Sequence, residues 1–271
     1  MIMGTVVMGV VNVTPDSFSD GGLWFAPDAA IAHGMDLLEQ GADILDVGGE
    51  STRPGAERVS EEEELRRVIP VIRELSRSGA RVSVDTMRAS VAAQALEEGA
   101  SIVNDVSGGL ADPDMARVVA AAGVTFVVMH WRGHSHTMQD RASYGDVVAD
   151  VCRELTARIT DLCARGVGRE QLIIDPGFGF AKMPEHNWSL LTHLDALQAL
   201  GQPVLIGTSR KAFLGRLGVP EGAEPRPPTQ RDAATAATTV VAGLARVWGV
   251  RVHDVSSSVD ALRVVTAMRE A

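Results

Sequence analysis

The chain has 271 residues, of which 45% are hydrophobic and 4% aromatic, and its formal net charge is −10. This length can bury a substantial core and is typical of a single (β/α) barrel. The acidic balance argues against a broad basic face for nucleic acid. An anionic ligand must therefore be held by a few local cations, a metal or helix N-termini.

The two cysteines, Cys152 and Cys163, are too few for a disulfide framework. Both fall in one predicted helix, where a separation of eleven positions gives about 16 Å of rise, too far for a bridge. We therefore expect reduced thiols in a reducing compartment. The first apolar run lacks the flanks of a signal peptide, and no apolar run reaches membrane-spanning length. These features predict a soluble, cytoplasmic protein without a membrane partner.

The first predicted strand starts at Val6 as a run of small and β-branched apolar residues, which is typical of a strand buried on both faces. It breaks at Asn12 into a polar loop that closes with Gly21 and Gly22. A buried strand with such an end delivers polar groups to the mouth of a barrel or the edge of a sheet. Alone, this loop is equally consistent with an ordinary polar turn.

The same sequence of amphipathic segment, glycine, apolar strand and polar residues recurs along the chain. The predicted strands cover 6–11, 43–47, 81–84, 101–103, 124–129, 171–174, 203–206 and 250–255, and the predicted helices cover 29–40, 61–77, 88–98, 113–122, 144–165, 186–200, 231–248 and 259–270. Because strands joined by helical crossovers are parallel, this alternation predicts one domain over 1–271, an α/β TIM (β/α)8 barrel. A doubly wound open sheet is the alternative, but its G-x-G-x-x-G fingerprint is missing after the first strand.

Polar residues follow almost every predicted strand. They are Asn12, Asp46, Glu50, Asp85, Asn104, Asp105, His130, Asp175, Lys211, Arg251, His253 and Asp254. The C-terminal strand ends of a barrel share one face, so we expect these side chains to converge. Alternation along a strand lets only one of Asn104 and Asp105, and one of His253 and Asp254, face inward. Each residue alone could be a cap or an ion-pair partner, but unpaired buried carboxylates are costly, so the whole set indicates a functional site.

Seven segments carry a resemblance to a known family. They are NVTPDSFSDGG, DVGGESTRPGA, SVDT, NDVSGG, DPGFGFAK, GTSRK and RVHDV. In this order and spacing, over essentially the whole chain, they resemble the dihydropteroate synthases of the folate pathway. The resemblance implies a TIM barrel that joins 6-hydroxymethyl-7,8-dihydropterin diphosphate to 4-aminobenzoate and releases pyrophosphate, with Mg²⁺ as cofactor. It also implies a homodimer.

The resemblance further implies a pterin pocket. Asp85, Asn104 and Asp175 match the pterin-binding positions, where acceptors suit the ring NH and the exocyclic NH₂ of the pterin. Lys211 matches the lysine that reaches the pterin carbonyl or ring nitrogen and borders the 4-aminobenzoate site. The walls of this pocket would be Met129, Phe180 and Gly207.

The diphosphate and the second substrate have matching positions as well. Arg251 and His253 match the diphosphate-binding pair, and their spacing of two points both side chains to the same face. Asn12 matches the Mg²⁺ contact, an oxygen ligand suited to a hard cation. Ser209 and the helix N-terminus after it are expected to receive the carboxylate of 4-aminobenzoate. Ala212 stands where some members carry a polar side chain, which leaves more of this task to backbone amides.

Two loops, expected to be mobile, would complete the site. The first contains Phe18 and Asp20. The second contains Thr52, Arg53, Pro54 and Gly55. We expect Asp85, Lys211 and Arg53 to act in catalysis, and the loops to close once the pterin diphosphate is bound.

Two other functions remain open, a pterin-dependent methyltransferase and a pterin-binding protein without activity. The first has no need of the STRPG loop or the SRK turn, and the second would be marked by loss of Arg53, Lys211 or Arg251, which are all present. The histidines of 130–136 suggest zinc, but no Cys or carboxylate stands at ligand spacing. The acidic run 61–64 is expected to begin a helix.

Overall fold

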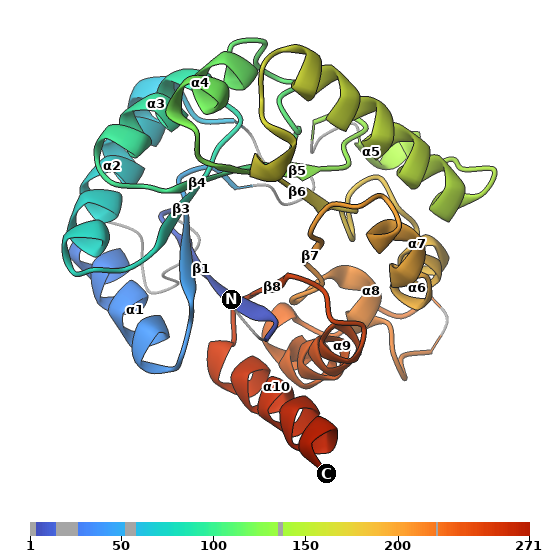
Figure 1. The fold of residues 1–271 in the computed structure, drawn as a ribbon. Coiled ribbons are helices and arrows are strands. Elements are labelled where there is room, and N and C mark those ends of the chain that lie inside the picture. Colours follow the sequence, from blue (N-terminus) through green and yellow to red (C-terminus); the bar gives the residue numbers. More distant parts are fainter. Residues whose placement is uncertain (1–3, 15–26, 52–57, 135–137, 221) are drawn as a thin grey trace.

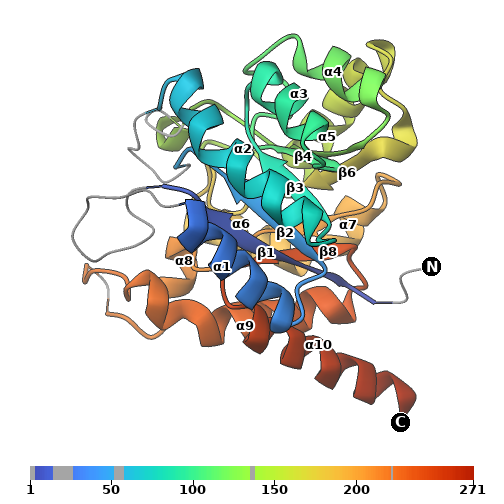
Figure 2. The same ribbon diagram turned by 90° about the vertical axis from the view of Figure 1, so that its left-hand side faces the viewer.

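The computed structural model describes residues 4–14, 27–51, 58–134, 138–220 and 222–271, and in these ranges parallel strands form a barrel with helices outside it (Figures 1 and 2). The strands are β1 Val6–Asn12, β2 Ile44–Gly48, β3 Val82–Asp85, β4 Ile102–Asp105, β5 Thr125–Met129, β6 Leu172–Asp175, β7 Leu205–Ile206 and β8 Gly249–Val252. The helices are α1 Pro27–Glu39, α2 Glu61–Arg77, α3 Ala89–Glu97, α4 Met115–Ala122, α5 Val147–Ala164, α6 Pro184–Thr192, α7 Leu194–Gln198, α8 Ala212–Gly215, α9 Asp232–Leu244 and α10 Val255–Glu270. The predicted (β/α)8 barrel is confirmed.

The strand order settles the choice between barrel and open sheet. Neighbouring strands follow β6-β5-β4-β3-β2-β1-β8-β7. The two end strands then meet, because Ile174 and Val204 form a parallel bridge and the amide of Ile174 donates to the carbonyl of Pro203 at 2.9 Å. The alternative of a doubly wound open sheet is therefore wrong.

The barrel interior changes from apolar to charged along the strand direction. Its apolar layer consists of Val6, Met8, Ile44, Ile102, Val127, Ile173 and Leu205. Two positions further along their strands, Asp46 follows Ile44 and Asn104 follows Ile102, so both point to the same interior. The remaining core packs between the strands and the surrounding helices. The fold thus places polar side chains inside the barrel, toward its C-terminal end.

Several predicted boundaries were wrong; the predicted helix 231–248, for example, ends at Leu244. The predicted strand 250–255 ends at Val252, and α10 begins at Val255 instead of 259. Asp254 causes this change, because its carboxylate accepts from the amide of Ser257 at 3.1 Å and caps the helix. The predicted helix 186–200 is divided at His193, which has φ −123° and ends α6.

The helix α5 contains both cysteines, as predicted, and both are half-buried free thiols. Asp146 begins this helix by accepting from the amides of Val148 and Ala149 at 2.9 and 3.1 Å. None of the helices within the described ranges is long and apolar enough to cross a membrane.

Candidate active site

Most of the predicted site residues lie at the C-terminal ends of the strands. Asn12 ends β1, Asp85 ends β3, Asn104 lies in β4, Met129 ends β5, Asp175 ends β6, Gly207 follows β7, and Arg251 lies in β8. Phe18, Asp20, Thr52, Arg53, Pro54 and Gly55 lie outside the described residues. The predicted convergence on one end of the barrel is thus seen for the strand residues.

Arg251 connects three strands at the centre of this group. Its Nε donates to Oδ2 of Asp46 at 2.6 Å, and its Nη2 donates to Oδ2 of Asp85 at 2.8 Å. Burial alone lowers the pKa of Arg251, but the charges of these two carboxylates outweigh it and hold the pKa above its ordinary value. The Arg251 side chain as a whole is 22% exposed.

Asp46 is a member of the site to which the sequence assigned no specific role. It is completely buried, and its Oδ2 also accepts from Nδ2 of Asn104 at 2.9 Å. This contact turns the amide nitrogen of Asn104 toward Asp46 and leaves the amide oxygen as the acceptor for a ligand. The sequence does carry a signal for Asp46. It is the acidic residue of an otherwise apolar strand, and it lies two positions after Ile44, so its side chain points to the same interior.

Asp85 is nearly buried and lies against β2. Burial raises the pKa of Asp85 to about 7, with the Arg251 guanidinium opposing this rise and the Asp46 carboxylate adding to it. Gly48 allows the close packing, because a Cβ at this position would lie 3.3 Å from the Cβ of Asp85. The carboxyl of Asp85 is therefore easier to protonate than that of an ordinary aspartate.

Asp175 and Lys211 face each other from β6 and from the loop after β7. Oδ1 of Asp175 accepts from the amide of Gly177 at 2.7 Å. Burial raises the pKa of Asp175, and this amide and the Lys211 ammonium oppose the rise. The Nζ of Lys211 lies 3.9 Å from the ring centroid of Phe180, and burial lowers the pKa of Lys211 to about 8. Gly207 belongs to the same group, since a Cβ there would lie 3.4 Å from Oδ2 of Asp175.

His253 contacts Ser209 in the loop after β7. Oγ of the buried Ser209 accepts from the amide of His253 at 3.1 Å and lies 3.0 Å from its Nδ1. The hydroxyl can donate to Nδ1 or accept from it, according to the tautomer of the imidazole. Ser209 thus orients His253 through both its backbone amide and its ring. The helix after it, α8, has only four residues.

The sequence predicted that only one residue of each adjacent pair, Asn104–Asp105 and His253–Asp254, faces inward, and the structure confirms that Asp105 and Asp254 turn away. Asp105 turns away from Asn104 and accepts from the amides of Ser107 and Gly109 at 2.7 and 2.8 Å. Asp254 caps α10 instead of entering the site. Alternation along β4 separates Asn104 from Asp105, whereas Asp254 lies beyond the end of β8 and is set apart from His253 by its capping role.

The acidic run 61–64 begins α2, as predicted, but its last member has a second task. Glu64 is buried, accepts from Oγ1 of Thr86 at 2.6 Å and pairs with Arg88. Arg88 also pairs with Glu50 at 2.9 Å. This network ties the N-terminal turn of α2 to the loop that follows Asp85.

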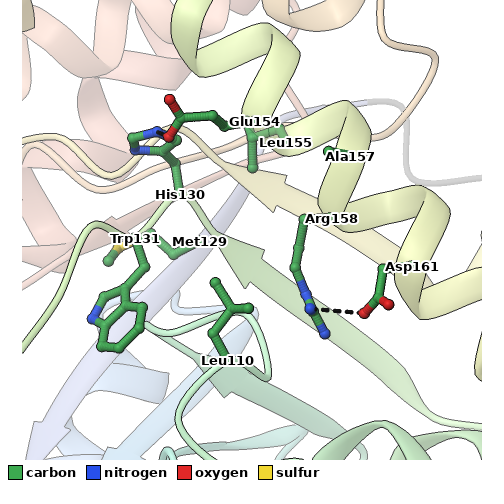
Figure 3. A pocket seen from close by; sticks show the side chains of 9 residues that line it. All are labelled: Leu110, Met129, His130, Trp131, Glu154, Leu155, Ala157, Arg158 and Asp161. Atoms are coloured by element: carbon green, nitrogen blue, oxygen red, sulfur yellow. Dashed lines mark hydrogen bonds and ion pairs between the residues drawn. The ribbon is translucent and has the colours of Figure 1, made fainter.

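The histidine segment does not form the suggested zinc motif within the described residues, where no group of three His, Cys, Asp or Glu residues could hold a metal. His130 is buried, and its Nε2 lies 2.9 Å from Oε2 of Glu154. The two side chains point toward each other beside a cavity of about 310 Å³ between α5 and the loops after β4 and β5 (Figure 3). His134 packs against Trp131, with ring centroids 5.1 Å apart, and His136 lies outside the described residues.

Comparison with known proteins places this geometry in a family. A family model described as pterin binding enzyme matches residues 8–253. Dihydropteroate synthase of Mycobacterium leprae is 54% identical over 266 residues, which cover 98% of this chain and 94% of that protein. Dihydropteroate synthase of Xanthomonas albilineans with 4-aminobenzoic acid is 46% identical, with a TM-score of 0.91 over 99% of this chain and 94% of that one. The same enzyme in complex with 7,8-dihydropteroate is 43% identical, with a TM-score of 0.88 over 100% of this chain and 96% of that one. The chain belongs to the dihydropteroate synthase family of pterin-binding enzymes.

Proposed function

We propose that the strand-end residues described above are the site at which this chain performs the reaction of its family. The chain is an enzyme of the transferase class in folate biosynthesis: it condenses 6-hydroxymethyl-7,8-dihydropterin diphosphate with 4-aminobenzoate to give 7,8-dihydropteroate and pyrophosphate. The observation that carries the site assignment is the convergence of Asp85, Asn104 and Asp175 with the cations Lys211 and Arg251 at one end of the barrel.

The carboxylates and the amide oxygen would recognise the pterin edge. Asp175 and Asp85 offer acceptors to the ring NH and exocyclic NH₂ groups, and Asn104 presents its amide oxygen because Asp46 holds its nitrogen. Lys211 would donate to the pterin carbonyl or ring nitrogen. Met129 and Phe180 would pack against the ring, with Phe180 already in contact with the lysine.

The chemistry breaks the bond between the pterin CH₂ group and the diphosphate oxygen and forms a bond from that carbon to the aniline nitrogen, which then loses a proton. Because an aniline is a weak nucleophile, departure of pyrophosphate must carry most of the activation. Arg251 and His253 would bind the diphosphate and neutralise the charge that develops on it. Arg251 uses Nε and Nη2 on Asp46 and Asp85, and its third nitrogen, Nη1, can still donate to a phosphate.

Mg²⁺ belongs to the proposal as a cation that accompanies the diphosphate. Asn12 is half-buried at the end of β1 and offers one amide oxygen. The described residues provide no cluster of three metal-binding side chains, which suits an ion whose other ligands are phosphate oxygens and water. When bound, the ion would add positive charge to the leaving group.

The second substrate would enter beside Lys211 and Ser209, under the two loops. The assignments of Phe18, Thr52, Arg53 and Pro54 to these loops rest on the family resemblance. A closed site would keep water from a cationic pterin-methyl carbon.

We also propose that the enzyme is a cytoplasmic homodimer. Four large apolar side chains are exposed on the packed pair of helices α9 and α10, namely Val241, Leu244, Val264 and Met268. Such a patch suits an isologous contact with a second copy. Light scattering should show a dimer that Val264→Glu dissociates. A dimer unchanged by this substitution would place the contact on another surface, and a monomeric unmodified chain would refute the assembly.

The function is tested by incubating the protein with pterin diphosphate, 4-aminobenzoate and Mg²⁺ and by measuring pyrophosphate and dihydropteroate. We expect both products in equal amounts. Arg251→Ala should abolish most of the release, whereas Arg263→Ala, which removes an exposed arginine of α10, should leave it unchanged. An unmodified chain that binds the pterin but releases no pyrophosphate would contradict the proposal.

A further inference from the structure

The chain uses lysine in only two places. Of its 25 basic residues, 23 are arginine, and the two lysines are Lys182 and Lys211. Lys211 belongs to the site described above. Lys182 ends the DPGFGFAK segment after β6 and has no assigned task, although its side chain is only 4% exposed. A cation buried this deeply must have specific partners.

The partners of Lys182 come from β5 and from its own loop. Its Nζ lies 3.0 Å from Nδ1 of His130 and donates to the carbonyl of Phe180 at 3.1 Å. Burial lowers the pKa of His130 to about 4, so its imidazole is neutral at pH 7. Nε2 then donates to Glu154, and Nδ1 accepts from the lysine (Figure 3 shows the outer half of this chain).

These bonds act on the loop that carries two site residues. The loop 175–181 lies directly on Lys182, because a Cβ at Gly177 would stand 3.4 Å from Nζ and 2.6 Å from the carbonyl oxygen of His130. The carbonyl of Phe180 is held by Lys182, while its ring lies under the Nζ of Lys211. Lys182 therefore fixes the backbone of the loop at Phe180, the residue whose ring Lys211 contacts.

The charge of Lys182 also reaches Asp175. Burial raises the pKa of Asp175, and after the amide of Gly177 the groups that oppose this rise are Lys211, Lys182 and Arg251, in that order. The effect is mutual. Burial lowers the pKa of Lys182 to about 7, and the charge of Asp175 opposes this change. The other charged groups that face Lys182 are Arg132, Glu154 and Lys211, and the ring of Tyr144 lies 5.9 Å from Nζ.

We propose that Lys182 is a positioning residue of the pterin site: its hydrogen bonds hold the loop 175–181 under Lys211, and its charge keeps Asp175 in the ionised form that accepts from the pterin. This inference rests on the proposed role of Asp175.

The first test compares Lys182→Met, which removes both the charge and the donor, with Lys182→Gln, which removes the charge and keeps a donor. Affinity for the pterin diphosphate is measured by calorimetry from pH 5 to pH 9. Loss of the cation raises the pKa of Asp175, so the pH below which affinity falls should move upward in both variants, on the order of one pH unit. Lys182→Gln should retain the greater share of kcat, because it can still bind the carbonyl of Phe180.

The second test uses the scarcity of lysine. Protein labelled with ¹³C at lysine Cε should give two lysine signals, assigned by their loss in Lys182→Met and Lys211→Met. We expect the Lys182 signal to titrate at least two pH units below an ordinary lysine, and to titrate at still lower pH in Asp175→Asn, because the carboxylate no longer favours the ammonium form. Asp260→Asn, an exposed change on α10, is the matched control and should leave it unchanged.

The outcomes separate the inference from the function on which it rests. If Asp175→Asn binds pterin diphosphate as tightly as the unmodified chain, the assignment of Asp175 fails, and the inference fails with it. If Asp175→Asn weakens binding but both Lys182 variants keep the unmodified pH profile, only the inference is overturned. The inference is also overturned if the Lys182 variants lose the same affinity at every pH and if Asp175→Asn leaves the titration of the Lys182 signal unchanged. Lys182 would then have a role in folding alone.

Discussion

At the scale of single residues, the site is a set of buried charges that satisfy one another. Arg251 is shared by Asp46 and Asp85, and Asp46 also fixes the amide of Asn104. A buried ion pair of this kind costs desolvation energy and contributes little net stability. Its value here lies in geometry, because it fixes which atoms of Asn104 and Arg251 remain for a ligand.

Asp175→Asn tests the pterin contact at this scale. Asparagine keeps the size of the side chain but adds two donors, so one contact with the pterin edge becomes donor against donor. Loss of a charge-assisted hydrogen bond should cost roughly 1.5–3 kcal/mol of binding free energy. Calorimetry with pterin diphosphate measures this cost, and undiminished affinity would remove Asp175 from the pterin site.

The raised pKa of Asp85 predicts a dependence on pH. Since the pterin donors favour the ionised form, affinity should fall as the pH drops below about 7, and Asp85→Asn should lose that contribution.

The folded pKa of Asp85 lies above the unfolded one, so the stability contributed by this group is lost as the pH rises from about 4 to about 7. The free energy of unfolding is measured with urea for the unmodified chain and for Asp85→Asn. Over this pH range, Asp85→Asn should become more stable relative to the unmodified chain. The opposite trend would mean that Asp85 is ionised at acid pH.

At the scale of elements, the pattern along each strand separates binding from structure. The first of two adjacent polar residues faces the interior, as Asn104 does, and the second turns outward to hold a turn or a helix, as Asp105 and Asp254 do. The glycines after β6 allow the loop to approach its neighbours closely. A Cβ at Gly179, where φ is +75°, would lie 2.9 Å from Cδ of Lys211.

The cap of α5 gives a prediction about stability without a change in chemistry. Asp146→Ala leaves the amides of Val148 and Ala149 without their acceptor, which should cost about 1 kcal/mol of unfolding free energy. Thermal unfolding should detect a loss of roughly 2–4 °C. Asp146→Asn, which can still cap, is the control and should lose little. A variant with alanine as stable as the unmodified chain would show that this cap contributes nothing.

At the scale of the whole molecule, the barrel brings residues that are far apart in the sequence to one end. Asp46 and Arg251 are 205 positions apart in the chain, and Asp85 and Arg251 are 166 apart. Parallel strands closed into a ring place all their C-terminal ends on one face, where the βα loops can cover it. The same arrangement separates the polar C-terminal end of the barrel from the apolar layer inside it.

The family resemblance predicts an order of binding. If the two loops close after pterin diphosphate and Mg²⁺ are bound, Arg53→Ala should leave pterin diphosphate affinity nearly unchanged and lower both turnover and the capture of 4-aminobenzoate. Binding of 4-aminobenzoate is compared by calorimetry in the free enzyme and in the enzyme with pterin and pyrophosphate. Equal affinity in both states would mean a preformed site and would remove Arg53 from the closing loop.

The amino-acid sequence by itself determined the eightfold repeat, the strand ends that carry the site and the family, because periodicity, glycine position and motif order are local properties of the chain. It also predicted the division of Asn104 from Asp105, which follows from alternation alone. Tertiary structure alone decided that Asp46 joins Arg251 to Asn104, that Glu64 of the acidic run accepts from Thr86, and that His130 contacts Lys182. Each of these contacts depends on the relative placement of different strands and loops, which is set by barrel closure and packing and leaves no periodic signal in the sequence.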